Sequence, residues 1–213
     1  MHEDRFASER RRLVETVKSA TNPKDERILA ALGDVLRHRF VPPSELASAY
    51  EDRALPLAED QTISQPSMVA IMLDALDCQP GDRALEVGGG SGYAAAVLAK
   101  LVAEVHATEI RPALAARAAA TLEGMGVHNV VVHVADGSRG LPEFAPYQRI
   151  LVSAGAPAVP KALVEQLAPG GRIAIPVGGD AVQTLRVGER GEDGDVRWTD
   201  SVPCMFVPLI ETG

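Results

Sequence analysis

Short apolar runs separated by longer amphipathic segments make up most of the chain beyond residue 82. The runs are rich in valine, isoleucine and alanine and predict buried strands at 84–87, 105–108, 130–134, 150–153 and 173–177. The segments between them predict helices at 93–101, 112–125 and 160–167, each suited to connect two parallel strands. This alternation predicts an α/β fold, a mostly parallel sheet with helices on both faces.

The first fifty residues carry a helical pattern instead. Asn22 is predicted as a helix N-cap, with Pro23 in the first turn and Asp25 at the third position. Pro42 and Pro43 prevent continuation, so this helix is predicted to end near residue 40. Its apolar stripe consists of Ile28, Leu29, Leu32, Val35 and Leu36. We expect a helical cap at the N-terminus.

A hydrophilic, glycine-bearing segment at 189–195 separates two strand-like stretches, 183–188 and 197–207. This pattern predicts an antiparallel hairpin at the edge of the sheet. With 213 residues, 46% of them hydrophobic, the chain is long enough for one well-buried domain. We therefore expect a single domain over residues 1–213.

The composition of the chain argues against nucleic-acid partners, membrane insertion, disulfides and metal binding. A net charge of −8 argues against nucleic acid, and the basic cluster 10–12 lies beside Glu9 and Glu15, as a solvated helix face would. No stretch reaches the roughly 18 apolar residues that a membrane span requires, and the charged N-terminus does not resemble a signal peptide. Cys78 and Cys204 are too few for a disulfide framework or a metal cluster. We expect a cytoplasmic monomer with no metal site.

The glycines at 88, 90 and 92 follow a predicted strand and precede a predicted helix, so the backbone there can approach a ligand closely. A dinucleotide-binding fingerprint would need its third glycine at the position of Tyr93. The observed spacing, with Glu86 two residues earlier, resembles motif I of class I methyltransferases, which bind S-adenosylmethionine.

Acidic residues follow the next two predicted strands. Glu109 is placed to accept the ribose hydroxyls of the cofactor. Asp136 stands where the resemblance implies an acceptor for the adenine amino group. The alternative is that the glycines only make a tight turn and the acids are surface charges. The cofactor-binding set that we predict is Glu86, Gly88, Gly90, Ser91, Gly92, Glu109, Ile110, Asp136 and Gly137.

Over most of its length the chain resembles the protein-L-isoaspartate O-methyltransferase family. The most specific match is the Thr-Ile-Ser-Gln-Pro run at 62–66. Further matching segments are 39–42, 54–57, 86–93, 128–130, 136–137, 163–167, 170–172, 175–178 and 206–209. The resemblance implies a division into a helical cap with the substrate loop (1–80), a cofactor-binding core (81–180) and C-terminal antiparallel strands (181–213).

Ser64 precedes a predicted helix with Gln65 at the N-cap and Pro66 in the first turn. Because helix N-termini favour anions, this position suits a carboxylate substrate. An isolated serine there would be read as an ancillary capping residue, but the family resemblance implies that Ser64 binds the acceptor carboxylate. The predicted substrate-binding set is Gln61, Thr62, Ile63, Ser64, Ser67, Ala154, Val207 and Leu209.

Methyl transfer to a carboxylate needs no general base, because a carboxyl with a pKa of about 4 is already ionised near neutrality. Catalysis then depends on alignment and on the exclusion of water. His106, His128 and His133 are accordingly predicted to have packing or surface roles. The resemblance implies esterification of isoaspartyl residues in proteins or peptides, release of S-adenosylhomocysteine, and repair through a succinimide.

Several positions depart from the usual family pattern: Glu59, Asp60, Ser67, Gln148 and Gly155. The added acids near the acceptor leave open a different peptide substrate. The first alternative is methylation of an ordinary aspartate in a natural-product precursor, to form aspartimide or isoaspartate. Two further alternatives are a cofactor-binding protein without transfer activity and a methyltransferase for small molecules.

Overall fold

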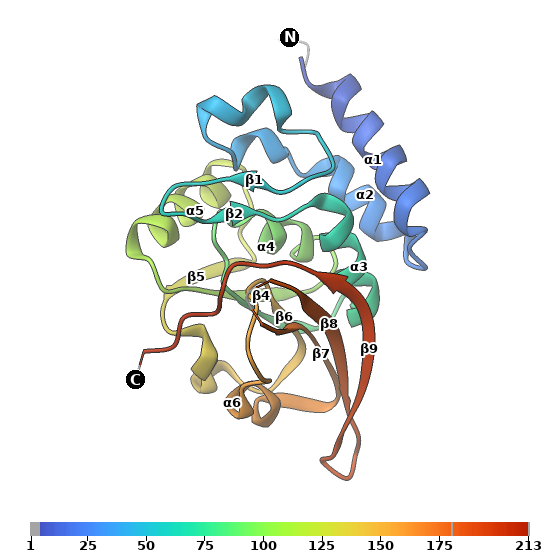
Figure 1. The fold of residues 1–213 in the computed structure, drawn as a ribbon, viewed down its shortest axis with the longest axis vertical. Coiled ribbons are helices and arrows are strands. Elements are labelled where there is room, and N and C mark those ends of the chain that lie inside the picture. Colours follow the sequence, from blue (N-terminus) through green and yellow to red (C-terminus); the bar gives the residue numbers. More distant parts are fainter. Residues whose placement is uncertain (1–4, 180, 213) are drawn as a thin grey trace.

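A computed structural model describes residues 5–179 and 181–212. Its main sheet has seven strands in the order β5-β4-β3-β6-β7-β8-β9, and a two-stranded sheet, β1-β2, lies apart from it (Figure 1). The helices are α1 (Ala7–Thr21), α2 (Glu26–Asp34), α3 (Pro66–Leu76), α4 (Tyr93–Leu98), α5 (Pro112–Gly124) and α6 (Lys161–Glu165). The strands are β1 (Leu55–Pro56), β2 (Thr62–Ile63), β3 (Arg83–Val87), β4 (Glu104–Glu109), β5 (Val130–Val134), β6 (Tyr147–Val152), β7 (Leu167–Gly178), β8 (Gln183–Arg190) and β9 (Val196–Cys204).

The five predicted parallel strands are confirmed. β3 pairs in parallel with β4 on one side and with β6 on the other, and β5 and β7 extend the sheet outward. Several boundaries were wrong. The helix predicted at 93–101 ends at Leu98, and the helix predicted at 160–167 ends at Glu165. The strands predicted at 150–153 and 173–177 begin earlier, at Tyr147 and Leu167. Leu167 belongs to β7 because it pairs with Tyr147 at the start of β6.

The N-terminal cap differs from its prediction in two details. Asp25, not Asn22, is the N-cap of α2, and its side chain accepts a hydrogen bond from the Arg27 N–H. Asn22 instead ends α1 in a left-handed conformation with φ of 43°. α2 stops at Asp34, well before the two prolines, because Val35 is extended. A short 3₁₀ helix, η1 (Arg37–Arg39), follows it and turns the Arg37 side chain into the interior.

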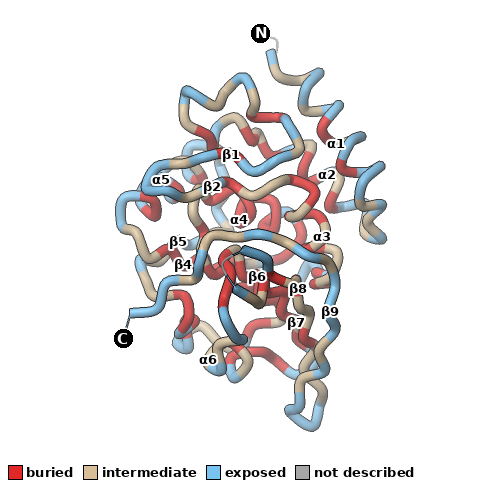
Figure 2. The backbone as a smooth tube through the Cα atoms, in the orientation of Figure 1, coloured by how far each residue is buried: buried red, intermediate tan, exposed pale blue. Residues whose placement is uncertain are grey.

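The sheet buries a core on each of its two faces. Successive residues of β3 point to opposite sides, so Ala84 belongs to the core that includes residues of α1 to α4, while Leu85 belongs to the core that includes Leu163 of α6. Figure 2 shows the central strands as largely buried and β9 as mostly exposed. The division of the chain at residues 80 and 180 stays a prediction.

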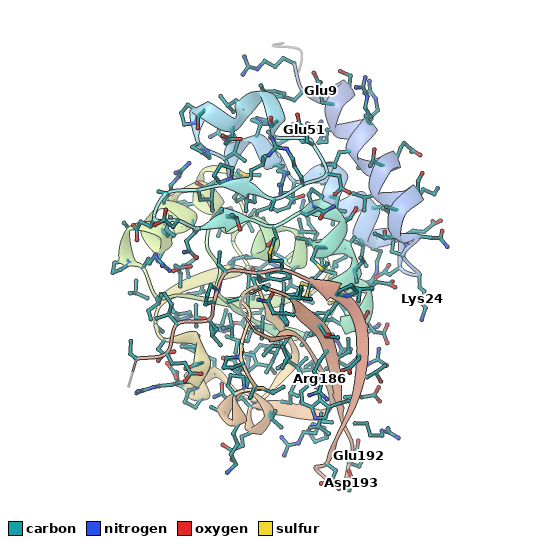
Figure 3. All side chains as sticks on the ribbon, viewed as in Figure 1. Glu9, Lys24, Glu51, Arg186, Glu192 and Asp193 are labelled. Atoms are coloured by element: carbon teal, nitrogen blue, oxygen red, sulfur yellow. The ribbon has the colours of Figure 1, made fainter. Side chains whose placement is uncertain are left out.

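The C-terminal hairpin is confirmed. β8 pairs antiparallel with β7 and β9, and Glu192 and Asp193 mark the hairpin tip, where their side chains project outward (Figure 3). After β9 the chain crosses the carboxyl ends of the parallel strands, where Val207 accepts a hydrogen bond from the Gly155 N–H and Leu209 donates one to the Gly155 carbonyl. No helix in residues 5–179 and 181–212 is long and apolar enough to cross a membrane.

Candidate active site

The glycine turn connects β3 to α4 at the point where the strand order reverses, and this is where open α/β sheets bind ligands. Gly88, Gly90 and Gly92 have φ values of 81°, 53° and 85°, a left-handed conformation that glycine adopts without strain. The N–H groups of Gly88 and Gly89 bind the Thr108 carbonyl at 2.9 and 2.8 Å. The turn is therefore held open by backbone contacts to the neighbouring strand.

Glu86 lies at the floor of this turn and is fully buried. One carboxylate oxygen accepts a hydrogen bond from Ser153 Oγ at 3.0 Å, but Oε2 has no partner among the described residues. Burial raises the pKa of the Glu86 carboxyl to about 8; the Ser153 hydrogen bond opposes this shift and the charge of Glu109 adds to it. An unpaired buried carboxylate oxygen fits the ammonium group of S-adenosylmethionine.

Glu109, at the end of β4, faces the same turn. Its Oε2 accepts the Gly90 N–H at 2.9 Å and its Oε1 accepts the Arg111 N–H at 2.9 Å. Each oxygen keeps acceptor capacity, so the carboxylate fits a pair of ribose hydroxyls. The predicted cofactor contacts of Glu86 and Glu109 thus come from neighbouring parallel strands, as the sequence suggested.

The Asp136 carboxylate accepts more hydrogen bonds from within the protein than the sequence suggested. Its Oδ1 accepts from Ser138 N–H and Oγ, and its Oδ2 accepts from the N–H and Oγ1 of Thr212 at 2.7 and 2.8 Å. Partial burial alone would raise the pKa of Asp136, but these hydrogen bonds from Ser138 and Thr212 lower it to about 2. Its role toward adenine stays a prediction. No sequence signal pointed to Thr212 as its partner.

Gly137 lies against the ends of the first two parallel strands. A Cβ added there would come within 2.6 Å of both Thr108 Oγ1 and Val87 Cγ1, so this position accepts only glycine without rearrangement.

Ser64 lies within a small cavity beside the glycine turn. Thr62, Glu86 and Ser153 line the same cavity. An adjoining cavity, which shares Gly88 and Gly90 with the first, is lined by many of the remaining predicted residues. They are Gln61, Thr62, Gly88, Gly90, Glu109, Ile110, Gly137, Ala154, Val207 and Leu209. The structure therefore brings most of the predicted cofactor and substrate residues to one crevice, covered by β1-β2 and the C-terminal segment.

Ser67 is placed differently. It lines neither cavity: its N–H binds Asp52 Oδ1 at 2.8 Å, and its hydroxyl donates to Asp52 Oδ2. Gln65 is at the N-cap position, as predicted, but the capping carboxylate comes from Asp52. The Ser67 N–H in the first turn of α3 is therefore not available to a substrate carboxylate, because Asp52 already binds it. Binding of a substrate carboxylate near Ser64 stays a prediction. Substrate binding by Ser67 stays a prediction.

The departures from the family pattern have visible structural roles. Gly155 leaves room for Gln183, whose amide would lie 2.8 Å from a Cβ at that position and which binds the Phe206 N–H at 2.7 Å. Gln148 accepts the Arg83 N–H at 2.8 Å. Glu59 and Asp60 adopt φ values of 58° and 55°, and the Glu59 carboxylate pairs with Arg111 at 3.4 Å.

The histidines agree with their predicted packing and surface roles. His106 is buried and stacks on Phe144, with its Nδ1 3.0 Å from Nε2 of His133. His128 is exposed. Among the described residues, no group of three or more histidine, cysteine or acidic side chains is arranged to hold a metal ion.

A parallel sheet with a glycine turn after its first strand, a buried acid before the turn and an acid at the end of the next strand define a class I methyltransferase. The family model of protein-L-isoaspartate(D-aspartate) O-methyltransferase matches residues 8–213. This chain belongs to that family.

Individual relatives extend the match. The chain is 51% identical over 206 residues to the protein-L-isoaspartate O-methyltransferase of Roseiflexus sp. (strain RS-1), covering 96% of this chain and 93% of the relative. It is 49% identical to that of Aeropyrum pernix, covering 97% of this chain and 81% of the relative. These names support the isoaspartyl interpretation and lend no support to the aspartate alternative.

Two solved structures share the fold. One, a protein-L-isoaspartate O-methyltransferase, has a TM-score of 0.86 and 29% identity, and the alignment covers 95% of this chain and 66% of that one. The other, a putative enzyme of the same name from Plasmodium falciparum, was solved with S-adenosyl-L-homocysteine. Its TM-score is 0.82 at 23% identity, covering 95% and 99% of the two chains.

Proposed function

We propose that this chain uses S-adenosylmethionine to methylate the free carboxylate of L-isoaspartyl residues in damaged proteins or peptides, and so begins their repair through a succinimide. The observation that carries this proposal is the position of Ser64 in one cavity with Glu86, the glycine turn and Ser153. A residue whose hydroxyl can bind an acceptor carboxylate thus lines the same cavity as residues that suit the cofactor.

In this proposal the chain aligns two reactants and supplies no base. When bound, S-adenosylmethionine supplies a methyl group that passes to the carboxylate oxygen, while its sulfonium becomes a neutral thioether. The Ser64 hydroxyl donates a hydrogen bond to the acceptor carboxylate, and β1-β2 with residues 207–210 limits water in the crevice. Alignment of this kind contributes up to roughly 7 to 11 kcal/mol in favourable cases.

Selectivity would follow from the shape of the acceptor. In an isoaspartyl residue the main chain runs through the side-chain carbonyl, so the α-carboxylate stands on a short branch. Such a branch can reach Ser64 between the covering segments, whereas the carboxylate of ordinary aspartate presents a different chain path. We also propose that the chain acts as a monomer in the cytoplasm, which sedimentation and cell fractionation test directly.

Paired peptides that differ only in isoaspartate or aspartate test the function, with labelled S-adenosylmethionine as donor. We expect label in the isoaspartyl peptide alone. Ser64→Ala should lower kcat/KM about 10- to 100-fold, as expected for a lost hydrogen bond to a charged group. Ser44→Ala, an exposed serine outside both cavities, is the matched control and should behave as wild type. Label in the aspartyl peptide only would overturn the proposal.

A further inference from the structure

Arg37 is an arginine with no exposed surface, which is unusual for a charged side chain. It belongs to η1, immediately after the extended residues that end α2. Among the residues that the structure describes, none forms an ion pair with it. Burial lowers the pKa of Arg37 from its usual value, and the nearby Tyr93 and Asp52 oppose that shift. An arginine nevertheless stays charged in proteins, so this charge needs other partners.

Three backbone carbonyls from separate segments provide those partners. Arg37 Nε binds the Ala49 carbonyl at 2.9 Å, Nη2 binds that of Arg53 at 3.1 Å, and Nη1 binds that of Ser64 at 2.9 Å. The planar guanidinium can make all three contacts at once because its donors diverge in a fixed fork. It therefore fixes Ser64 relative to the chain on both sides of β1-β2.

The guanidinium also lies over the ring of Tyr93, with its central carbon 4.7 Å from the ring centroid. Tyr93 is the first residue of α4 and follows the glycine turn directly. Arg37 thus contacts both the residue that we propose binds the acceptor and the residue that ends the cofactor turn. It lines neither cavity, so it does not touch the reactants.

Asp52 holds the other side of Ser64. Its carboxylate caps the Ser67 N–H at 2.8 Å, and its backbone carbonyl accepts the Gln65 side-chain amide at 3.0 Å. The Ser64 carbonyl is therefore held by Arg37, while Gln65 and Ser67, at the start of α3, are held by Asp52. Asp52 also lines neither cavity.

We propose that Arg37 and Asp52 are positioning residues for methyl transfer: between them they fix the Ser64 hydroxyl at a set place relative to the glycine turn. This inference rests on the proposed function of Ser64. An in-line displacement loses rate steeply when the acceptor is displaced, so a loosened Ser64 lowers kcat. The glycine turn keeps its own bonds to Thr108, so cofactor affinity stays near that of wild type.

Arg37→Lys tests the arginine, because lysine keeps the charge but cannot reach three carbonyls with one ammonium. We expect kcat on an isoaspartyl peptide to fall about tenfold or more. The Kd for S-adenosylhomocysteine, measured by calorimetry, should stay within about twofold. Asp52→Asn, at a half-buried site, should also lower kcat while leaving the Kd unchanged, but by a smaller factor. If Arg37→Lys does not fold, Asp52→Asn tests the proposal in its place.

Arg149→Lys is the matched control. Arg149 is also a buried arginine; it donates to the Asp77 carbonyl and pairs with Asp82 at 3.0 Å, on β6 at the opposite end of the strands from the crevice. The Arg149→Lys variant should have a lower midpoint of thermal unfolding and an unchanged kcat. If Arg149→Lys lowers kcat as much as Arg37→Lys at equal loss of stability, the positioning role is overturned.

A double-mutant cycle with Ser64→Ala tests whether Arg37 affects kcat through Ser64. If Arg37 acts through Ser64, Arg37→Lys adds little further loss in the Ser64→Ala background, and the two effects are strongly non-additive. Fully additive losses would overturn the inference while leaving the proposed function intact. A wild-type protein that methylates no isoaspartyl peptide would instead defeat the proposed function, which separates the two failures.

Discussion

The cofactor side of the crevice is built from the backbone of the sheet, whereas the substrate side is a short loop held by one buried and one half-buried side chain. On the cofactor side, Gly88 and Gly89 bond directly to a strand carbonyl. On the substrate side, β1 and β2 have two residues each, and Arg37 and Asp52 supply the bonds that so small a sheet lacks. The two sides should therefore respond differently to substitution. The cofactor side should be sensitive to changes in backbone geometry, and the substrate side to the loss of single side chains.

The largest effect is expected from Gly137→Ala. The added methyl group would meet Thr108 Oγ1 and Val87 Cγ1 at 2.6 Å, which forces the strand ends apart. We expect a loss of about 1–3 kcal/mol in the free energy of unfolding, and weaker binding of S-adenosylhomocysteine. Chemical denaturation and calorimetry measure the two. Gly81→Ala, which meets no atom within 4 Å, is the control and should change neither quantity.

Glu86→Gln tests how the buried carboxyl affects both the pH dependence of stability and cofactor binding. Since burial raises the pKa of Glu86 to about 8 in the folded protein, the folded state holds a proton that the unfolded chain has already lost above about pH 4.5. The free protein should therefore lose stability as pH rises from about 5 to 8. Glu86→Gln should show a flatter profile and at least about tenfold weaker S-adenosylhomocysteine binding. Identical pH profiles for the two proteins would contradict the buried, unpaired carboxylate.

Ser67→Ala tests the hydrogen bond between Ser67 and Asp52, which lies on the substrate side only. The variant loses one hydroxyl bond to Asp52, so the free energy of unfolding should fall by about 1 kcal/mol while cofactor affinity is kept. Thermal unfolding and peptide kinetics check this. A rise in the peptide KM at unchanged stability would show that Ser67 contacts the acceptor, as the sequence suggested, and not mainly Asp52.

The smallest effect is expected from Asp60→Gly in the loop between β1 and β2. Asp60 has a φ of 55°, which glycine adopts more easily. We expect a gain of up to about 1 kcal/mol in stability, with methyl transfer unchanged. Asp60→Ala should not stabilise, because alanine meets the same left-handed strain. A stabilising alanine would mean that removal of the charge, and not backbone strain, is the cause.

The sequence predicts the cofactor side well because its signals are local. Strand-like runs, three spaced glycines and an acid after the second strand each follow from a few neighbouring residues, and parallel strands bring their ends together. Helix boundaries were less certain: Asn22 and Asp25 are both good caps, and only the extended conformation of Val35 ends α2 early.

The substrate side could be predicted only in part. The run at 62–66 singled out Ser64, but Arg37 and Asp52 carry no periodic or motif signal, and a lone arginine after a helix is usually exposed. The same holds on the cofactor side for Thr212, the partner of Asp136. Arg37 binds backbone carbonyls, Asp52 binds the Ser67 N–H and hydroxyl and the Gln65 amide, and Thr212 binds the Asp136 carboxylate. These partners are 12 to 76 residues away in sequence. Such contacts exist only once the chain has folded.

The unpaired oxygen of Glu86 also has a thermodynamic consequence for ligand uptake. Near neutrality burial keeps the Glu86 carboxyl largely protonated, and a bound ammonium group would favour its ionised form. Cofactor uptake should therefore expel a proton into the medium. The apparent enthalpy of uptake would then vary with the ionisation heat of the buffer, and affinity would weaken as the solution is acidified.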